Sequence, residues 1–201
     1  YEPVKLVRET YGPDLLLQVD ANTAYTRDDF DLLKRLDEFN LLLIEQPIYE
    51  EDMLGHAKLA DYIDTPVCLD ETIISADIAR DAIELGAAEI INIKPSRVGG
   101  YIESVKIHDI SVANNIPVWC GGMLETGIGR AANLALAAMP GFTLPGDTSA
   151  SSRYFETDLT EPFVLVDGHI SVPTGPGIGV DPIPEIIERF AVSREWIKRP
   201  N

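Results

Sequence analysis

The chain has 201 residues, and a hydrophobic content of 45% is typical of a globular protein with a substantial core. Its 33 acidic and 16 basic residues leave a net charge of -17, which argues against nucleic-acid binding because phosphate neutralisation requires a basic surface. No apolar run is long enough to span a bilayer, so a membrane protein is not expected.

Apolar segments that end in a polar residue recur along the chain. Each is typical of a strand that is buried on both faces and followed by a turn. The segments are 15–22, 41–47, 66–72, 89–96, 116–123 and 142–149. The polar residues that end the first four are Asp20, Glu45, Asp70 and Lys94, and successive members are 25, 25 and 24 positions apart.

Helical patterns fill the gaps between these strands. The predicted helices are 1–11, 26–40, 75–87, 100–115 and 125–139, with Thr26 and Ser75 as N-caps. After residue 155 the pattern changes to a hairpin turn at Asp167-Gly168, a glycine-rich loop over 174–182 and a short helix over 183–192.

Alternating strands and helices at this period predict an α/β fold with a parallel sheet. A doubly wound sheet and a closed (β/α)8 barrel both satisfy the pattern, and the even period with polar strand ends favours the barrel. About six units are visible, and two more would add roughly 50 residues, within the usual barrel size. We therefore expect a TIM-type barrel that is N-terminally truncated. Residues 1–154 form its partial catalytic barrel, and residues 155–201 form a C-terminal tail.

Barrel active sites collect at the carboxyl ends of the strands. Asp20, Glu45 and Asp70 would meet there as an oxygen-donor site for a hard cation such as Mg²⁺. Each acid alone is more often a helix cap or turn residue, but the common register makes that explanation weaker. Lys94 is either a salt-bridge partner or a candidate base.

Neighbouring residues could support this site or stand outside it. Asn22 and Glu71 adjoin two of the acids and are expected to assist them. The "GGM" turn at residues 121–123 either lets a substrate approach the backbone or is a plain tight turn.

Cys68 and Cys120 lie inside apolar runs, which indicates buried reduced thiols and a cytoplasmic location. A zinc site is not expected, because no Cys-x-x-Cys pair occurs and the three histidines are scattered. Those histidines, which are predicted to be non-catalytic, are His56, His108 and His169.

The segments "VDAN", "IEQP", "LDET", "NIKPSRVGG", "GGMLETGIGR" and "PGDTSAS" together resemble the barrel domain of the enolase superfamily. The branch that they resemble most contains o-succinylbenzoate synthase and N-acylamino acid (N-succinylamino acid) racemase. This resemblance implies Mg²⁺ or Mn²⁺ at Asp20, Glu45 and Asp70, where the metal binds a small-molecule carboxylate substrate and stabilises the enediolate left by the α-proton.

The same resemblance assigns further roles. Lys94 would move the α-proton on one face in racemisation, or stabilise charge in the dehydration that belongs to the menaquinone pathway. Gly122, Met123 and Leu124 match a loop that contacts the acyl end of the ligand. The family also has a Lys-x-Lys strand and an N-terminal capping domain, which do not occur in this sequence. We therefore expect an inactive fragment with open sheet edges near Leu15 and Leu144. Its tail would pack on the capping domain of an intact homo-oligomer.

Three alternatives remain open. The muconate-cycloisomerase branch and the dipeptide epimerases share the acids and the lysine. A class II aldolase would place histidine ligands at strand ends, where none occurs. The chain could also be a non-catalytic, metal-binding part of a barrel.

Overall fold

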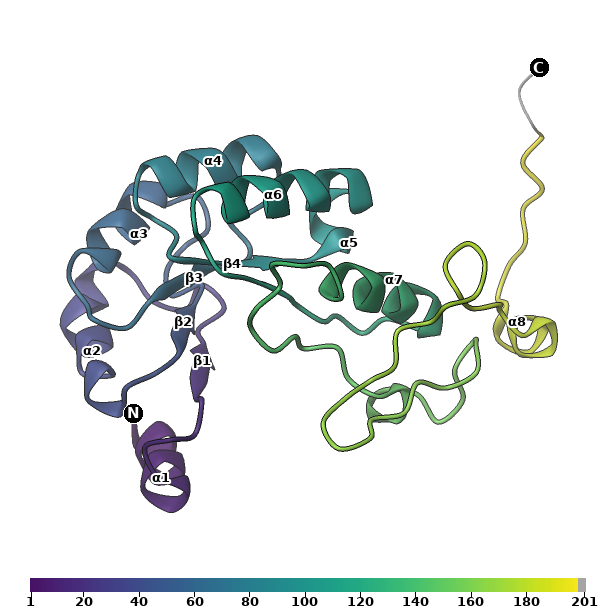
Figure 1. Cartoon of the computed structure of the whole chain (residues 1–201), viewed down its shortest axis with the longest axis horizontal. Helices are drawn as coiled ribbons and strands as arrows, with labels where there is room; N and C mark the ends of the chain where they lie inside the picture. The colour runs from purple at the N-terminus through teal and green to yellow at the C-terminus, as the bar shows by residue number, and fades with distance from the viewer. Residues whose placement is uncertain (199–201) are drawn as a thin grey trace. The chain divides into compact units, whose positions relative to one another are not determined.

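The structure is a computed structural model that describes residues 1–198 (Figure 1). The chain packs as two compact units. The first comprises Tyr1–Gly121 with Met139–Gly146, and the second comprises Gly122–Ala138 with Asp147–Asn201. The predicted domain boundary between residues 154 and 155 does not coincide with this division by packing, and it stays a prediction.

Short strands alternate with helices through the first unit and into the second. In chain order the elements are α1 (Glu2–Tyr11), β1 (Gln18–Asp20), α2 (Phe30–Lys34), β2 (Leu43–Glu45), α3 (Met53–Ala60), β3 (Val67–Leu69), α4 (Ala76–Glu84), β4 (Ile90–Ile93), α5 (Pro95–Val98), α6 (Tyr101–Ala113), β5 (Val118–Cys120), α7 (Gly127–Ala137) and α8 (Pro184–Phe190). Single 3₁₀ turns occur at Arg27–Asp29, Asp37–Phe39 and Ser151–Arg153.

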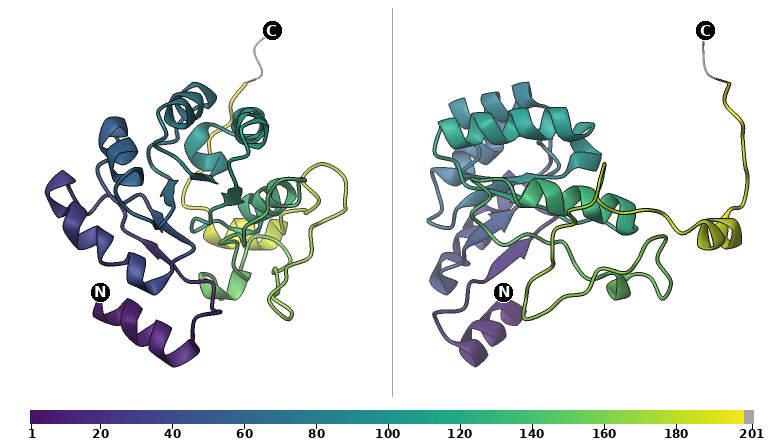
Figure 2. Two further views of the ribbon diagram at one scale, coloured as in Figure 1. Left: turned by 60° about the vertical axis from the view of Figure 1, so that its left-hand side comes forward. Right: turned by 45° about the vertical axis from the view of Figure 1, so that its right-hand side comes forward.

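The five strands form one parallel sheet in the order β1-β2-β3-β4-β5, so each strand pairs with its predecessor in the chain. Helices α2, α3, α4 and α6 lie along one face of this sheet (Figures 1 and 2). A doubly wound sheet would reverse its strand order part-way and carry helices on both faces. The sequential order confirms the predicted parallel α/β class and is that of a half-barrel.

Two predicted elements are wrong in detail. The strand over 142–149 is reduced to a single parallel bridge between Val118 and Phe142, because Pro145 has no N–H to donate to a sheet and Gly146 follows it.

The helix over 26–40 is broken after Lys34. There the carboxylate of Asp37 accepts hydrogen bonds from the backbone N–H groups of Asp64 and Thr65, at 3.0 and 2.9 Å.

Local signals that rest on short-range chemistry are confirmed. Ser75 caps α4 by accepting from the N–H of Ile78 at 3.2 Å. Thr26 forms a reciprocal capping box with Asp29. The predicted hairpin turn closes through two backbone bonds between Val166 and His169, at 2.8 and 2.9 Å. Its two central residues both have positive φ, as a type I′ turn requires.

An apolar layer fills one face of the sheet. Leu43, Cys68, Ile90 and Trp119 come from four neighbouring strands and are all buried. The indole Nε1–H of Trp119 points at the Cys68 sulfur, 3.4 Å away. Leu144, near which the sequence predicted an open sheet edge, is half-buried and packs against this layer.

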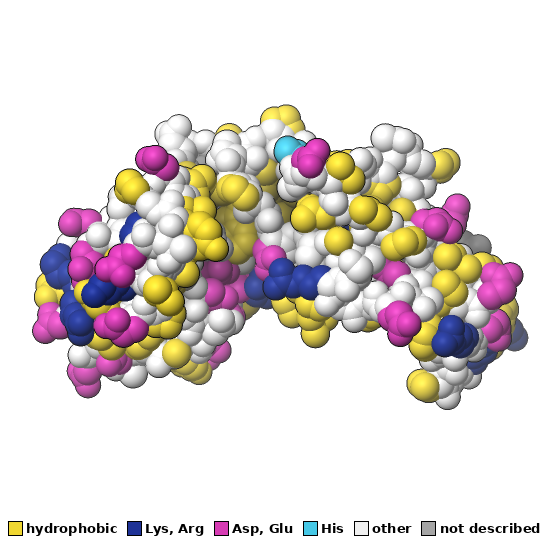
Figure 3. All heavy atoms as spheres, turned by 90° about the horizontal axis from the view of Figure 1, so that it is seen from below, with side chains coloured by type: hydrophobic (Ala, Val, Ile, Leu, Met, Phe, Trp, Pro, Cys, Tyr) yellow, Lys and Arg dark blue, Asp and Glu magenta, His cyan; other side chains and the backbone are white. Residues whose placement is uncertain are grey.

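The surface is acidic, as the net charge requires. On the face shown in Figure 3, Asp and Glu side chains are spread among neutral and apolar ones. Both cysteines are buried, as predicted, and no disulfide joins them. Through residue 198, no helix is both long and apolar enough to cross a membrane.

Candidate active site

A polar layer lies one step further along the strands than the apolar layer. Side chains on a strand alternate between its two faces, so residues two positions apart share a face. Glu45, Asp70, Asn92 and Gly121 each follow a member of the apolar layer by two positions. The sequence therefore places carboxylates and an amide on the same face as the core, at the carboxyl ends of β2, β3 and β4.

Asp20 and Glu45 are direct register partners in the pairing of β1 with β2. Asp20 is exposed, and its Oδ1 accepts a hydrogen bond from the backbone N–H of Asn22 at 2.9 Å. Asn22 thus supports Asp20 through its main chain, with its own φ at +45°. The 25-residue spacing predicted from the sequence corresponds to this lateral pairing.

Glu45 is a buried carboxylate that forms no salt bridge with a cationic side chain of the described residues. Its side chain is 3% exposed, and its Oε1 accepts from Nδ2 of Asn92 at 2.6 Å. Burial raises the pKa of Glu45 to about 7, against the opposing effect of the Asn92 hydrogen bond. No Lys, Arg or His lies within 4.0 Å of this carboxylate in the described chain. An isolated buried acid of this kind binds either a proton or a cation.

Asp70 is buried between two cations. Its Oδ2 lies 2.6 Å from Nζ of Lys94, and its Oδ1 accepts from Nη1 of Arg97. Arg97 also donates to the carbonyl oxygens of Ile73 at 2.8 Å and Asn92 at 2.6 Å. Burial lowers the pKa of Arg97 to about 10. The salt bridge considered for Lys94 is therefore present, and it fixes the ammonium group at the end of β4.

Gln46 joins the ends of β2 and β3. It is fully buried, and its Oε1 accepts from the backbone N–H groups of Asp70 at 2.9 Å and Thr72 at 3.2 Å. Its Nε2 donates to the Thr72 hydroxyl at 2.8 Å and to the carbonyl of Ile48 at 3.2 Å. One amide side chain thus fixes the turn that carries Asp70.

Gly121 leaves room for the side chains of Asn92 and Lys94. A Cβ at this position would lie 2.4 Å from Oδ1 of Asn92 and 2.5 Å from Cε of Lys94. Those separations are far below van der Waals contact, so any side chain at residue 121 would displace both groups. The glycine signal in the sequence thus corresponds to a steric requirement beside Lys94.

The acids match Mg²⁺ in donor type, while their side chains are not gathered around one point. All three offer carboxylate oxygens, which Mg²⁺ prefers. Two further buried acceptors, Oδ1 of Asn92 and Oε2 of Glu71, have no hydrogen-bond partner among the residues that the structure describes. Within residues 1–198, however, no three His, Cys, Asp or Glu side chains are arranged so that they could hold a metal ion. The predicted metal set therefore stays a prediction, which rests on the donor chemistry of the three acids and on the strand register of Asp20 with Glu45.

Gly122, Met123 and Leu124 belong to the second unit. They form the start of the loop before α7, where Met123 is 50% and Leu124 is 70% exposed. The backbone of Gly122 touches that of Asp147, because a Cβ on the glycine would lie 1.9 Å from the Asp147 carbonyl oxygen.

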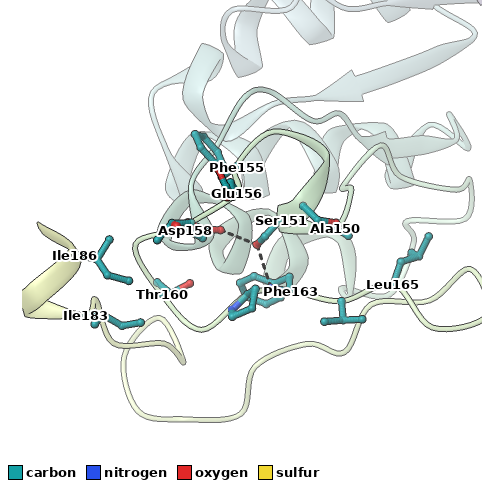
Figure 4. A pocket seen from close by; sticks show the side chains of 14 residues that line it. Ala150, Ser151, Phe155, Glu156, Asp158, Thr160, Phe163, Leu165, Ile183 and Ile186 are labelled. Carbon is teal, nitrogen blue, oxygen red and sulfur yellow. Dashed lines mark hydrogen bonds between the residues drawn. The ribbon is translucent and has the colours of Figure 1, made fainter. Parts of the chain in front are cut away.

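The second unit also contains a cavity of about 550 Å³ (Figure 4). Phe155, Phe163 and Ile186 contribute apolar walls. Its buried polar pair is satisfied internally, since the Ser151 hydroxyl donates to Asp158 at 2.6 Å and accepts from the N–H of Phe163 at 3.0 Å. The cavity therefore offers no unpaired buried group for catalysis.

The histidines have structural surroundings. His56 is buried between Gln46, whose amide nitrogen is 3.3 Å away, and the carbonyl oxygen of Asp52 at 2.9 Å. Burial lowers the pKa of His56. His108 stacks on Phe142 with the ring centroids 5.4 Å apart. Neither ring contacts the polar layer's acids in these interactions.

Three residues of the site were missed by the sequence analysis: Asn92, Arg97 and Gln46. Asn92 carried a signal, because a polar residue two positions before Lys94 in the apolar "IINIK" run must share its face. Arg97 lies three positions after Lys94, one helical turn away in α5. Gln46 had no signal beyond its place in the turn, because its bonds depend on the fold of residues 70–72.

Comparison with known proteins agrees with this geometry. A family profile described as "Enolase C-terminal domain-like" matches residues 1–186. The chain belongs to this enolase superfamily. An N-succinylamino acid racemase from an Amycolatopsis species is 65% identical to it over 196 residues, which are 98% of this chain and 53% of that protein.

Two further relatives are an enzyme that carries the other name of the predicted branch and a solved structure with the same fold. An o-succinylbenzoate synthase from Bacillus subtilis strain 168 is 48% identical over 195 residues, or 96% of this chain and 52% of that protein. A crystal structure of an enolase superfamily member from Listeria innocua superposes with a TM-score of 0.92 at 44% identity, covering 96% of this chain and 52% of that one. The chain spans about half the length of the curated relatives that it matches.

Proposed function

We propose that a protein containing this chain removes a proton from the carbon next to a carboxylate, as an o-succinylbenzoate synthase, an N-acylamino acid racemase or both. The observation that carries this proposal is the position of Lys94. Its ammonium group is held at the end of β4, 2.6 Å from Asp70, which belongs to the same polar layer as the buried Glu45. The names of the relatives at 65% and 48% identity support the choice of reaction.

Asp20, Glu45 and Asp70 are the proposed ligands of Mg²⁺ or Mn²⁺. A bound cation would hold the substrate carboxylate and stabilise the negative charge that develops on it. The burial of Glu45 without a cationic side-chain partner supports this assignment, because a bound cation would favour its charged form. Asn92 orients Glu45 through its amide N–H, and Asn22 orients Asp20 through its main chain.

Lys94 moves the proton. In racemisation its Nζ takes the proton from the α-carbon on one face, or returns it there, while a second base serves the other face. In dehydration the Lys94 ammonium group stays charged and stabilises the anionic intermediate. Arg97 also pairs with the Asp70 carboxylate. Asp70 therefore keeps a cationic partner when the Lys94 side chain turns toward a substrate. Gly122, Met123 and Leu124 contact the acyl group.

The complete enzyme is proposed as a (β/α)8 barrel with a Lys-x-Lys strand and a capping domain, because its relatives are about twice as long as this chain. It would be a homo-oligomer. Two buried thiols support a cytoplasmic location, where cysteines stay reduced.

The test is Lys94→Ala in a protein of the relatives' length that contains this chain, assayed in D₂O. We expect racemisation to be lost in both directions while deuterium exchange at the α-carbon survives for a single enantiomer, because each base serves one face. Dehydration should fall as well. Lys58→Ala, at an exposed lysine of α3, is the matched control and should leave both reactions unchanged. Exchange of both enantiomers at wild-type rates would reduce Lys94 to a structural salt bridge.

A further inference from the structure

Arg130 joins two separate segments of the second unit. This arginine of α7 is 1% exposed. Its Nη2 donates to the carbonyl oxygen of Glu125 at 2.9 Å, and its Nη1 donates to the carbonyl oxygen of Ser149. The loop before α7 and the segment that begins at Asp147 are therefore held by a single guanidinium group.

The loop before α7 is fixed at other points as well. The carboxylate of Glu125 accepts from the backbone N–H of Met123, with its two oxygens 2.9 and 2.8 Å away. It also accepts from Nδ2 of Asn133 at 2.8 Å. The backbone of Gly122 is already in contact with Asp147. The exposed side chains of Met123 and Leu124 thus project from a rigid backbone.

The guanidinium group is buried at an energetic cost. No carboxylate lies within 4.0 Å of Arg130 among the described residues, and its Nε has no hydrogen-bond partner. The contacts of the Arg130 guanidinium are carbonyl oxygens, the Ser149 hydroxyl and the ring of Tyr154. A buried charge without a carboxylate partner destabilises a fold relative to an apolar side chain of similar size. The planar guanidinium group fixes the geometry between the carbonyl groups of Glu125 and Ser149. An ammonium group cannot reproduce this geometry.

We propose that Arg130 is a positioning residue that sets the preference for the acyl group by fixing the loop of Gly122, Met123 and Leu124. This inference rests on the proposed function, because that function assigns this loop to the acyl end of the substrate. Arg130 itself is buried beneath the loop and acts through its backbone. The favoured class of substrate is an N-acyl amino acid whose acyl group ends in a carboxylate, as in the name of the 65% identical relative.

The test compares Arg130→Lys with wild type in the protein of the relatives' length. The substrates are the N-succinyl and N-acetyl derivatives of one amino acid. We expect the ratio of the two kcat/KM values, succinyl over acetyl, to fall about tenfold, mostly through KM for the succinyl substrate, because a small displacement of a positioning loop weakens transition-state contacts. A general loss of folded enzyme cannot change this ratio, since both substrates are assayed on the same preparation.

Arg153→Lys is the matched control. Arg153 is exposed and lies over the ring of Tyr154 at 5.6 Å, as the Arg130 guanidinium does at 6.0 Å. The Arg153→Lys variant should keep the wild-type ratio of the two kcat/KM values. Glu125→Ala is a second variant, which releases the N–H of Met123 without changing Arg130, and it should lower the same ratio.

The outcomes separate the two proposals. If wild type racemises neither derivative and also fails to catalyse the dehydration, the proposed function fails. If wild type catalyses the dehydration but racemises neither derivative, the proposed function stands and the inference about Arg130 is overturned. If wild type is active and shows no acyl preference, or if Arg130→Lys keeps the wild-type ratio, the inference about Arg130 is overturned. If Arg130→Lys does not fold, Glu125→Ala decides, and an unchanged ratio in that variant overturns the inference.

Discussion

At the scale of single residues, Glu45 and Asp70 show how position decides what a carboxylate can do. Both are buried at strand ends, yet Asp70 is paired with Lys94 and Arg97, whereas Glu45 accepts a single amide hydrogen bond. Burial raises the pKa of Glu45 to about 7, because burial disfavours the charged carboxylate relative to the neutral acid. A cation beside Glu45 would relieve this cost.

Changing Glu45 to Gln tests its proposed role as a ligand. We expect the affinity for Mn²⁺ to fall at least about tenfold and turnover to disappear, because the amide keeps the shape of the side chain but carries no charge. Isothermal titration with Mn²⁺, in the protein of the relatives' length, measures the first effect apart from activity.

Glu51→Gln is the control for that experiment. Glu51 is an exposed acid six positions later in the chain, and its replacement should change neither metal binding nor turnover. Wild-type Mn²⁺ affinity with full activity in Glu45→Gln would remove Glu45 from the metal site.

At the scale of elements, the ends of the strands are organised by side-chain hydrogen bonds to the backbone. Gln46 has positive φ, at +37°, and holds the turn after β3 through the N–H groups of Asp70 and Thr72. Left-handed backbone is uncommon for a residue other than glycine, and here the side-chain hydrogen bonds of Gln46 stabilise it.

Replacing Gln46 by Met tests this organisation. It would keep the length of the side chain and leave two buried N–H groups without their acceptor, so we expect the free energy of unfolding to drop by roughly 2–6 kcal/mol. Gln18→Met is the control, because Gln18 is the exposed first residue of β1. It should change stability by less than about 0.5 kcal/mol. Urea denaturation of both variants gives the comparison, and equal stabilities would contradict the role of Gln46.

The sequence predicted what depends on periodicity and on local caps. The register of Asp20 with Glu45, the start of α4 at Ser75 and the turn at Asp167-Gly168 all follow from such signals. It did not predict bonds between elements. The break after Lys34 depends on Asp37 reaching Asp64 and Thr65, and the pairing of Asp70 with Arg97 depends on the pairing of β3 with β4, after which α5 begins. Such contacts join segments about 25 residues apart, beyond the reach of a pattern.

At the scale of the whole molecule, the parallel sheet has an unpaired edge. Within the described residues β1 pairs only with β2, whereas β5 has a further bridge to Phe142. Leu15 and Leu16, just before β1, are 39% and 69% exposed. Unpaired strand edges that carry apolar side chains promote association between molecules.

We therefore expect the 201-residue chain, expressed alone, to self-associate through the β1 edge. Light scattering after gel filtration should give a mean mass that rises with concentration. Leu16→Lys should lower this association, because a lysine on a sheet edge opposes strand pairing. Leu54→Lys, at a leucine of α3 that is 59% exposed, is the matched control and should leave the association unchanged. A single monomeric mass at all concentrations, or an equal effect of both substitutions, would show that the β1 edge does not drive association.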